Sequence, residues 1–410
     1  MYNSNTEGIL MSQQQQPPRR LTRKELLKRN KRIAKKRQMR LTFIGIAMTV
    51  FLVYITGIYG ASLAYLGDFV SSGLVYLQFG SGFPVEAENQ TFLQAERMGT
   101  SMCILDGDGL SFYSPTGDKV YEYHHSMQRP VISASDKRVA IYNANETSIK
   151  IANAHNILFS QEMTNDIIHA SLAHNNYLVL TTKSQSYNGE VKVFDSQMNE
   201  IFTWLNAKSF PMQSFLSPKA QTLAVSCLMT ENGNLVSDVY IIDTSDGSEK
   251  HTIQNKDGVP LAIEFIRESK LIIFYTDKAV VFDLATGQTE KEYSYDGRDL
   301  TAYDIKNSQI VMSLGDYDGL SETVIVLCDL SLNTAHTMTT PRHITDVVFT
   351  SQRICALGEE VVEQYNLKGE KAGETAVKSN VKDILDYHGC IVVSGDSLEK
   401  LEKADMEQKG

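Results

Sequence analysis

A short pattern of strand, turn and strand recurs along most of this 410-residue chain and limits the folds open to it. In "VVFDLATGQTEKEY", Val280 to Tyr293, an apolar run ends in a polar residue and a Thr-Gly turn, and a second run leaves the turn. β-Branched and aromatic residues bounded by turn residues are the local signal for a β-hairpin. A single hairpin is only marginally stable in water, so this one needs neighbours.

The same hairpin occurs seven times between residues 111 and 375. The polar residues that enter the seven turns are Ser114, Asn153, Asp195, Asp243, Asp283, Asp329 and Asn366, at spacings of 39, 42, 48, 40, 46 and 37 residues. Each hairpin follows an apolar strand such as "KLIIFYT" from Lys270, and most of these strands follow one more short run, such as "PLAIEFI" from Pro260. Four strands in a period of about 40 residues form one blade of a β-propeller. The 3.6-residue spacing of a helical solenoid is not visible after residue 100, so the predicted fold is an all-β propeller.

The number of blades depends on how the last unit ends. The stretch from Val381 supplies three strands before the chain stops. We expect eight blades, with the missing outer strand supplied by the segment around Phe83 to Phe92, because such an exchange closes the ring and hides the edges of the sheets. Seven blades are the alternative if Ser397 to Lys403 is only a tail.

The first 66 residues differ sharply from the rest in charge. Residues 1–40 hold twelve Lys or Arg and two acidic residues, a balance of +10, whereas the remainder holds 27 basic and 47 acidic residues, a balance of −20. Between them, residues 41–66 carry no charge. About 20 apolar residues cross a bilayer core, so this stretch predicts one transmembrane helix. A cleaved signal peptide is the rival interpretation, but its apolar region is normally only about 7–15 residues long, behind a short basic start.

The charges also predict the topology. Lys and Arg beside a membrane helix stay on the cytoplasmic side, which makes the chain a single-pass cell-membrane protein with a cytoplasmic N-terminus and an extracytoplasmic C-terminal domain. The basic run is expected to face anionic lipid rather than nucleic acid. The predicted domains are a disordered to helical leader (1–40), the transmembrane helix (41–66), a linker (67–82), the propeller (83–403) and a tail (404–410).

The repeats allow a resemblance to be stated. "VFDLATG" and "IIDTSDG" resemble the loose signature of quinoprotein-like and YVTN-type propeller repeats. The layout of basic leader, single span and exported propeller resembles an uncharacterised family of membrane-anchored propellers, a domain of unknown function, in Gram-positive bacteria. The resemblance implies a location in the cell envelope and carries no catalytic residues to this chain. Trp204 is the one tryptophan, so the tryptophan motif that quinoprotein dehydrogenases repeat in every blade is missing.

Motifs that would indicate chemistry are weak. Asp106-Gly107-Asp108-Gly109 has alternating carboxylates, but a calcium loop needs ligands over twelve residues and a closing Glu, so a strand-connecting turn is the better interpretation. The histidines lack further ligands at metal spacing. The five cysteines contain no CxxC pair and lie among apolar neighbours, so we interpret them as core residues. We therefore expect no catalytic, cofactor or metal site, and the chain is not expected to be an enzyme.

A candidate binding surface comes from the links between the second and third strands of the blades. These links lie on the same face of a propeller as the links between blades, and most of them are short here. Three are longer and rich in Asn, Gly, Asp and Tyr: "KSQSYNGE" from Lys183, "MTENGNLVSD" from Met229 and "GDYDGLSE" from Gly315. Tyrosine is favoured at interfaces, and the predicted partner-binding rim consists of Tyr187, Asn188, Asn232, Asn234, Asp316, Tyr317 and Asp318.

Two functional classes fit these features. In the first, the propeller is a tethered binding or scaffold module for a protein or polymer of the cell envelope. In the second, it is an envelope enzyme of hydrolase type that uses the central face of the propeller, where loops from many blades converge. Because no convincing nucleophile, metal set or carboxylate pair is visible in the loops, the sequence favours binding.

Overall fold

The computed structural model describes residues 44, 82–87, 91–316 and 322–401. The predicted leader, almost all of the predicted membrane segment and linker, and the predicted tail lie outside these residues. Within the described part of the chain, no helix is long and apolar enough to cross a membrane.

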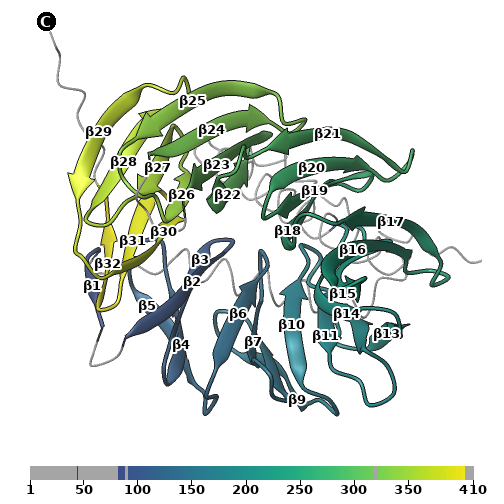
Figure 1. Ribbon diagram of the computed structural model, residues 1–410. Coiled ribbons are helices and arrows are strands. Elements are labelled where there is room, and N and C mark those ends of the chain that lie inside the picture. Colours follow the sequence, from purple (N-terminus) through teal and green to yellow (C-terminus); the bar gives the residue numbers. More distant parts are fainter. Residues whose placement is uncertain (1–43, 45–81, 88–90, 317–321, 402–410) are drawn as a thin grey trace, which may run out of the picture. The chain divides into compact units, whose positions relative to one another are not determined.

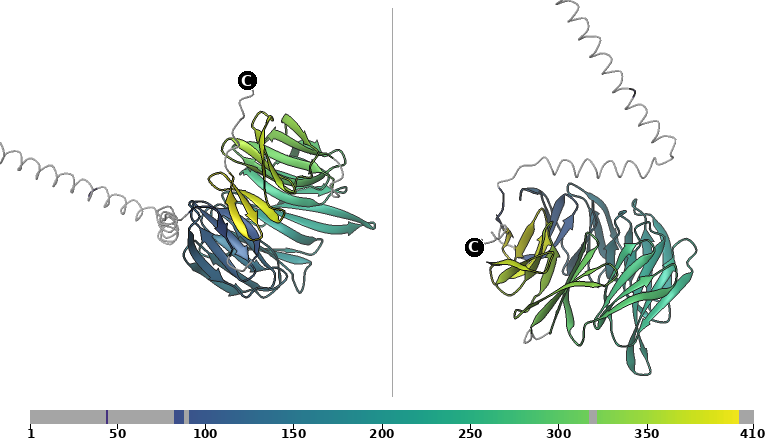
Figure 2. Two further views of the ribbon diagram at one scale, coloured as in Figure 1. Left: turned by 90° about the vertical axis from the view of Figure 1, so that its left-hand side faces the viewer. Right: turned by 90° about the horizontal axis from the view of Figure 1, so that it is seen from above.

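From residue 82 onward the described chain forms eight antiparallel sheets of four strands each, which are the blades of a propeller. Figure 1 shows the inner strands of the eight blades around a common centre, and the two views in Figure 2 show the sheets side by side. The strands of the first four blades are β2 (Phe92–Met98), β3 (Ser101–Asp106), β4 (Gly109–Tyr113) and β5 (Lys119–His124); β6 (Pro130–Ala134), β7 (Val139–Asn143), β8 (Ser148–Ala152) and β9 (Ile157–Glu162); β10 (Ile167–Leu172), β11 (Leu178–Thr182), β12 (Gly189–Phe194) and β13 (Glu200–Asn206); and β14 (Phe210–Leu216), β15 (Thr222–Glu231), β16 (Asn234–Asp243) and β17 (Glu249–Asn255).

The second half of the ring repeats this order. Its strands are β18 (Pro260–Arg267), β19 (Lys270–Tyr275), β20 (Lys278–Asp283) and β21 (Gln288–Ser294); β22 (Asp299–Lys306), β23 (Gln309–Gly315), β24 (Thr323–Asp329) and β25 (Thr334–Thr340); β26 (Asp346–Phe349), β27 (Arg353–Leu357), β28 (Val361–Asn366) and β29 (Lys371–Ala376); and β30 (Val381–Asp386), β31 (Cys390–Ser394), β32 (Ser397–Lys400) and β1 (Val85–Glu86). We number the blades 1 to 8 in this order.

Blade 8 is closed by the N-terminal strand of the domain. Strand β1 pairs with β32, with Val85 opposite Leu398. Leu398 is fully buried, so Ser397 to Lys400 form a blade strand and not a tail. The prediction of eight blades is therefore confirmed, and the closing strand is shorter than expected, because Phe92 already belongs to the inner strand of blade 1.

The seven turn residues identified in the sequence all shape the turn between the third and fourth strands of a blade. In the opening hairpin, Asp283 Oδ1 accepts hydrogen bonds from the backbone N–H groups of Ala285 and Thr286, at 2.9 and 2.8 Å. The side-chain oxygens of the other six residues accept equivalent bonds from the backbone that follows them. This side-chain bond is why Asp, Asn and Ser favour turns. In blade 8 the third strand, β32, and the fourth strand, β1, come from opposite ends of the described domain, so no turn of this kind joins them.

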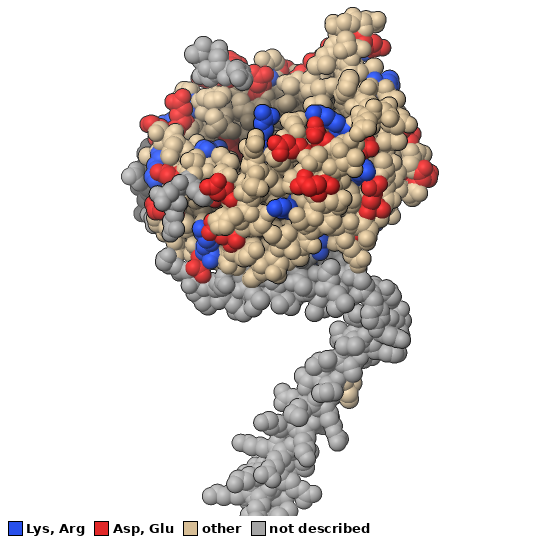
Figure 3. All heavy atoms as spheres, turned by 90° about the horizontal axis from the view of Figure 1, so that it is seen from below, with Lys and Arg blue, Asp and Glu red and all other residues tan. Residues whose placement is uncertain are grey.

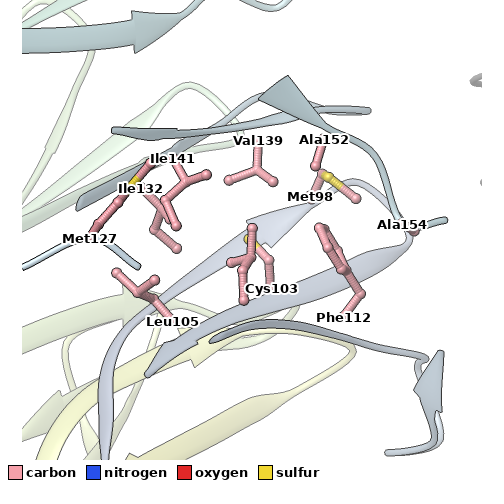
Figure 4. Close-up of a cluster of buried hydrophobic side chains, with 11 residues drawn as sticks. Met98, Cys103, Leu105, Phe112, Met127, Ile132, Val139, Ile141, Ala152 and Ala154 are labelled. Atoms are coloured by element: carbon pink, nitrogen blue, oxygen red, sulfur yellow. The ribbon is translucent and has the colours of Figure 1, made fainter. Parts of the chain in front are cut away.

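The hydrophobic core lies between neighbouring blades. Figure 4 shows Leu105 and Phe112 of blade 1 facing Ile132, Val139 and Ile141 of blade 2. The second strand of a blade is buried on both faces, as in β7, where all five residues are buried. The outer strands are exposed, as in β21. The five cysteines are all buried free thiols, in agreement with their interpretation as core residues.

The antiparallel order gives the ring two faces. We call the upper face the one that holds the links from second to third strands and the links between blades. The lower face holds the links from first to second strands and the Asp, Asn and Ser turns. The motif at Asp106 is one of the upper-face turns, since Asp106 Oδ1 accepts hydrogen bonds from the N–H groups of Asp108 and Gly109, so its interpretation as a strand-connecting turn is confirmed.

Candidate functional site

The inner strands share an irregularity that their sequences do not reveal. In six of the eight blades the pairing of the first strand with the second shifts by one residue near the upper end of the inner strand. The additional residues are Leu93, Ile168, Met212, Leu261, Thr301 and Lys382. A bulge of this kind re-aims one side chain, and bulges are common beside functional sites.

Because the first strand of each blade begins at the upper face, these six residues lie near the upper ends of the inner strands, and we call them the collar. Its apolar arc comprises Leu93, Ile168, Met212 and Leu261, from blades 1, 3, 4 and 5, whereas Thr301 and Lys382 of blades 6 and 8 are polar. Leu93 is 46% exposed, and Met212 and Leu261 are each 41% exposed. Apolar side chains that remain in contact with water are available to a ligand.

More exposed apolar side chains lie outward from the collar, on blades 3 and 4. We call this group the blade 4 patch: Tyr187, Leu205, Phe210 and Leu235, whose exposed fractions are 44%, 44%, 57% and 54%. The pairing of Phe210 with Leu228, and of Thr230 with Leu235, puts Phe210 and Leu235 on one face of the blade 4 sheet.

The blade 3 side of the patch is fixed by hydrogen bonds. The backbone N–H of Asn188 donates to Asn206 O at 2.9 Å, and its side-chain Nδ2 donates to Ala207 O at 3.0 Å. Strand pairing places Glu190 opposite Leu205. These contacts bring the link that carries Tyr187 beside the connection between blades 3 and 4, where Leu205 and Phe210 lie.

The predicted rim is only partly assembled as expected. Tyr187 and Asn188 lie in the link between β11 and β12 and belong to the neighbourhood of the blade 4 patch. Asp316 follows β23 in blade 6, and Tyr317 and Asp318 lie outside the described residues. Asp316 belongs to blade 6, whereas the other described rim residues belong to blades 3 and 4, so the rim remains a prediction.

One of the three long links is not a loop, which corrects the sequence interpretation. Residues 229–231 pair with residues 234–236 as a continuation of β15 and β16, so the link is a two-residue turn of Asn232 and Gly233. Both residues have positive φ, 51° and 85°. Asn-Gly is the preferred sequence for a hairpin turn of this hand. Asn232 and Asn234 therefore lie at the tip of a long hairpin, and this hairpin also carries Leu235.

Polar side chains of the inner strands, one of them in the collar, join the blades. At six of the eight blade boundaries, an inner-strand side chain hydrogen-bonds to the backbone of the next inner strand. Two examples are Gln94, which bonds both N–H and C=O of Ile132 at 3.1 Å, and Asp346, whose Oδ2 accepts from Ile384 N–H at 2.9 Å. In the other four bonds, Ser171 and Lys382 donate to a backbone C=O, and Ser133 and Asp304 accept from a backbone N–H.

Several channel carboxyl groups have raised pKa values because protein surrounds them. Burial raises the pKa of Glu96 to about 7, and the nearby carboxylate of Glu264 adds to the rise. Burial, together with a hydrogen bond to Asp346, raises the pKa of Asp383 to about 9. Both oxygens of Asp346 accept backbone N–H bonds, from Val347 and Ile384, so Asp383 is the partner that holds the shared proton.

At the lower mouth the channel opens into a cavity of about 340 Å³. Arg97, Asp136, His174 and Glu264 lie around it. His174 Nδ1 is 3.6 Å from Asp136 Oδ2, and this contact raises the pKa of His174 and lowers that of Asp136. Glu264 Oε1 accepts a hydrogen bond from Tyr303 OH at 3.0 Å, and burial raises the pKa of Glu264. In the described ranges, no three His, Cys, Asp or Glu side chains are arranged to hold a metal ion.

Sequence reasoning missed the collar and the channel groups. The bulges depend on how the first strand pairs with the second, and the blade-joining bonds link residues that are far apart in the sequence, by 38 to 45 positions in five cases and by 290 in the sixth. The sequence did contain one indication of the channel groups. Polar residues such as Gln94 and Glu96 in "FLQAERM" occur inside short strands whose other residues are typical of buried strands. A buried strand tolerates such residues only where they have partners or water.

Comparison with solved structures identifies the same architecture in unrelated sequences. A computationally designed protein, Ika8, superposes with a TM-score of 0.59 at 12% identity, over 77% of this chain and 98% of that one. BamB from Moraxella catarrhalis gives a TM-score of 0.53 at 12% identity, over 78% and 100% of the two chains. A eukaryotic initiation factor gives 0.54 at 12% identity, over 78% and 85%. At this identity the likeness shows the fold alone. Comparison with curated proteins finds no match.

The profile of one protein family covers nearly the whole described domain. It is the family of unknown function DUF5711, and it matches residues 82–402. The chain belongs to this family.

Proposed function

We propose that this member of the DUF5711 family is a membrane-tethered binding module that holds a protein of the cell envelope against the upper face of its propeller. The collar and the blade 4 patch carry this proposal. Of the eleven large apolar side chains that are exposed in the described propeller, seven lie on the upper face: Leu93, Tyr187, Leu205, Phe210, Met212, Leu235 and Leu261. Gathered exposed apolar side chains on a soluble domain mark interaction sites.

The charge of the domain indicates the kind of partner. The chain after residue 40 has a surplus of 20 acidic charges, and the inner strands β2, β22 and β26 carry Glu96, Asp304 and Asp346. Figure 3 shows carboxylates and cations interspersed on one side of the propeller, so on that side the surplus is not gathered into a patch. A partner loop with an apolar tip and neighbouring Lys or Arg residues would match both the collar and the channel, since complementary charge speeds and orients association.

The proposed role also includes attachment to the membrane through the N-terminal part of the chain. Residues 41–66 span the cell membrane once, the basic leader lies on the cytoplasmic side against anionic lipid, and the propeller is outside the cytoplasm. The role is binding without catalysis. A propeller held near the membrane by residues 67–82 would keep its partner close to the bilayer.

The test is the recovery of a partner from the native envelope. We expect the triple variant Phe210→Ser, Met212→Ser and Leu235→Ser to retain the fold, because all three side chains are at least 41% exposed. It should recover at least tenfold less partner than the unmodified chain, since losing buried apolar contacts worth about 1.4 kcal/mol changes a binding constant tenfold.

A matched control is available on the lower face. Ile157, Leu158 and Leu367 are exposed to a similar degree, at 38%, 43% and 36%. The triple serine variant at these positions should recover the partner normally. Equal recovery by both variants would reject the upper face as the binding site.

A second function is favoured by the cavity at the lower mouth. Glu264, with its raised pKa and its bond from Tyr303, and the pair of His174 and Asp136 supply groups that a hydrolase of envelope polymers could use for proton transfer. The variant Glu264→Gln separates the two functions. Binding at the upper face predicts normal partner recovery and no lost activity, whereas the hydrolase predicts that turnover of an envelope polymer depends on Glu264.

A further inference from the structure

Two of the five cysteines meet across the interface between blades 7 and 8. Cys355 comes from β27 and Cys390 from β31, the second strands of adjacent blades, and their thiols are joined by a hydrogen bond. They are 2% and 4% exposed and belong to one apolar cluster with Leu357, Ile384 and Val392.

The other three thiols have different surroundings. Cys103 Sγ donates to Glu96 O at 3.3 Å, and Cys328 Sγ donates to Ile310 O at 3.8 Å. Cys227 Sγ accepts a hydrogen bond from Asn206 Nδ2 at 3.5 Å. Cys355 and Cys390 are therefore distinguished from the rest by having a thiol as neighbour.

A cavity connects this pair with the surface. It has a volume of about 230 Å³, and its lining includes both cysteines and Arg353, Gln364, His388 and Gly389. Ser351 and Gln352, which also line it, are exposed residues of the lower-face link between β26 and β27. A small thiol reagent can thus approach the pair from the lower face without unfolding a blade.

We propose that Cys355 and Cys390 are a modification site, where oxidation forms a disulfide that joins blade 7 to blade 8. The oxidant is a low-molecular-weight disulfide, which the domain would meet in the extracytoplasmic location proposed above, so this part rests on the proposed function. The thiolate of one cysteine attacks a sulfur of the oxidant, breaks its S–S bond and releases the first thiol. The second cysteine attacks the mixed disulfide, forms the Cys355–Cys390 bond and releases the second thiol. The two cysteine protons pass to the two released thiols, so two electrons move from the pair to the oxidant.

The location gives the bond a consequence for the ring. Blade 8 is the closing blade, and its outer strand β1 has only two residues. A covalent link from β31 to β27 attaches the middle of blade 8 to its neighbour independently of that short strand. Since a cross-link restricts the unfolded chain, the oxidised domain should resist unfolding better than the reduced one.

The reduced pair should react slowly while the domain is folded. The hydrogen bond to Cys355 and burial raise the pKa of the Cys390 thiol, and exchange requires the thiolate. The test therefore has two arms on the full chain in detergent: incubation of the folded protein with oxidised glutathione at pH 8.5, and refolding from denaturant in a glutathione redox buffer. Free thiols are then alkylated with N-ethylmaleimide in denaturant and counted by mass spectrometry.

In at least one arm, we expect three alkylated cysteines in place of five and a cross-linked pair of tryptic peptides, 354–368 and 383–400, that lacks two hydrogens. The oxidised protein should melt at a higher temperature than the reduced protein. Cys355→Ser and Cys390→Ser should each abolish the cross-link and the redox-dependent difference in melting, whereas Cys103→Ser should retain both. Five alkylated cysteines in both arms, glutathione adducts without the cross-link, or a disulfide that involves another cysteine would overturn the proposal.

Discussion

Individual polar side chains on the inner strands connect neighbouring blades through hydrogen bonds. Asp346 accepts two backbone N–H bonds and bonds to Asp383, whose pKa is raised to about 9. Two carboxyl groups in contact cannot both be ionised without a large electrostatic cost, so one keeps its proton. This pair lies at the boundary of blades 7 and 8, close to the position where the ring closes.

The Asp346–Asp383 pair predicts a pH dependence of stability. The folded state holds the Asp383 proton more tightly than the unfolded state, whose Asp has a pKa near 3.8. Unfolding therefore releases a proton between about pH 4 and pH 9, and the free energy of unfolding should fall as the pH rises through this window.

The variant Asp383→Asn, which resembles the protonated acid, tests this prediction. At each pH, the free energy of unfolding of the unmodified chain is subtracted from that of the variant. We expect this difference to be larger at pH 8.5 than at pH 5 by at least about 1 kcal/mol, the equivalent of a shift of about one pKa unit. Urea unfolding at both pH values measures the difference. The exposed control Asp257→Asn should give the same small effect at both, and a pH-independent effect at Asp383 would contradict the shared proton.

Strand pairing determines where the collar residues and the closing strand β1 lie. Each bulge adds one residue near the upper end of an inner strand and so gives the collar its side chains. The closing strand β1 has two residues, but its neighbours Phe83 and Ala87 pack with Val85 against the cluster that contains Tyr387 and Leu398. Closure therefore combines two paired residues with apolar contacts on either side of them.

Replacing residues 83–87 by a Gly-Ser segment of equal length should open blade 8. We expect a loss of about 2–4 kcal/mol of stability from the lost apolar burial, and aggregation because the edge of β32 is left unpaired. Thermal melting followed by fluorescence and light scattering measures both effects. The same replacement at residues 67–71, in the predicted linker, is the control, and equal behaviour of the two variants would contradict closure by β1.

The elements were predictable from the sequence where the signal is local. The turn residues such as Asp283 and the strands on either side of them identify blades, because each hairpin consists of consecutive residues in the sequence. The closing strand could also be inferred, since blade 8 lacked one strand. The bulge at Met212, the bond from Asp346 to Ile384 and the contact of Cys355 with Cys390 could not, because each depends on pairing register or on contacts between blades. The Asn232 hairpin was misread as a loop because a polar strand extension beyond the core has the composition of a loop.

At the scale of the whole molecule, charge and apolar surface are distributed unequally along the chain. The first 40 residues carry a balance of +10 and the rest a balance of −20, separated by 26 uncharged residues. In the described propeller, seven of the eleven exposed large apolar side chains lie on the upper face, on blades 1, 3, 4 and 5. These two asymmetries support the proposed arrangement of a cytoplasmic leader, a membrane span and an exported domain that binds through one face.

The proposed topology predicts where fused reporters work. A reporter that is active only after export should function when fused after Gly410 and fail when fused before Met1, because the positive leader stays in the cytoplasm. Activity assays on whole cells measure this, with a reporter that is active only in the cytoplasm as the reciprocal control. The reverse pattern would contradict the orientation.

The most direct test of the binding account is site-specific photo-crosslinking in the native envelope. A photoreactive amino acid at Met212 or Leu261 in the collar, or at Leu235 in the blade 4 patch, should cross-link to the same single protein. The same probe at Ile157 or Leu367 on the lower face should not. Recovery of one shared partner from the three upper-face positions is the predicted result. Cross-links from the lower-face positions alone, or none from the collar in cells where the protein is folded, would contradict the account.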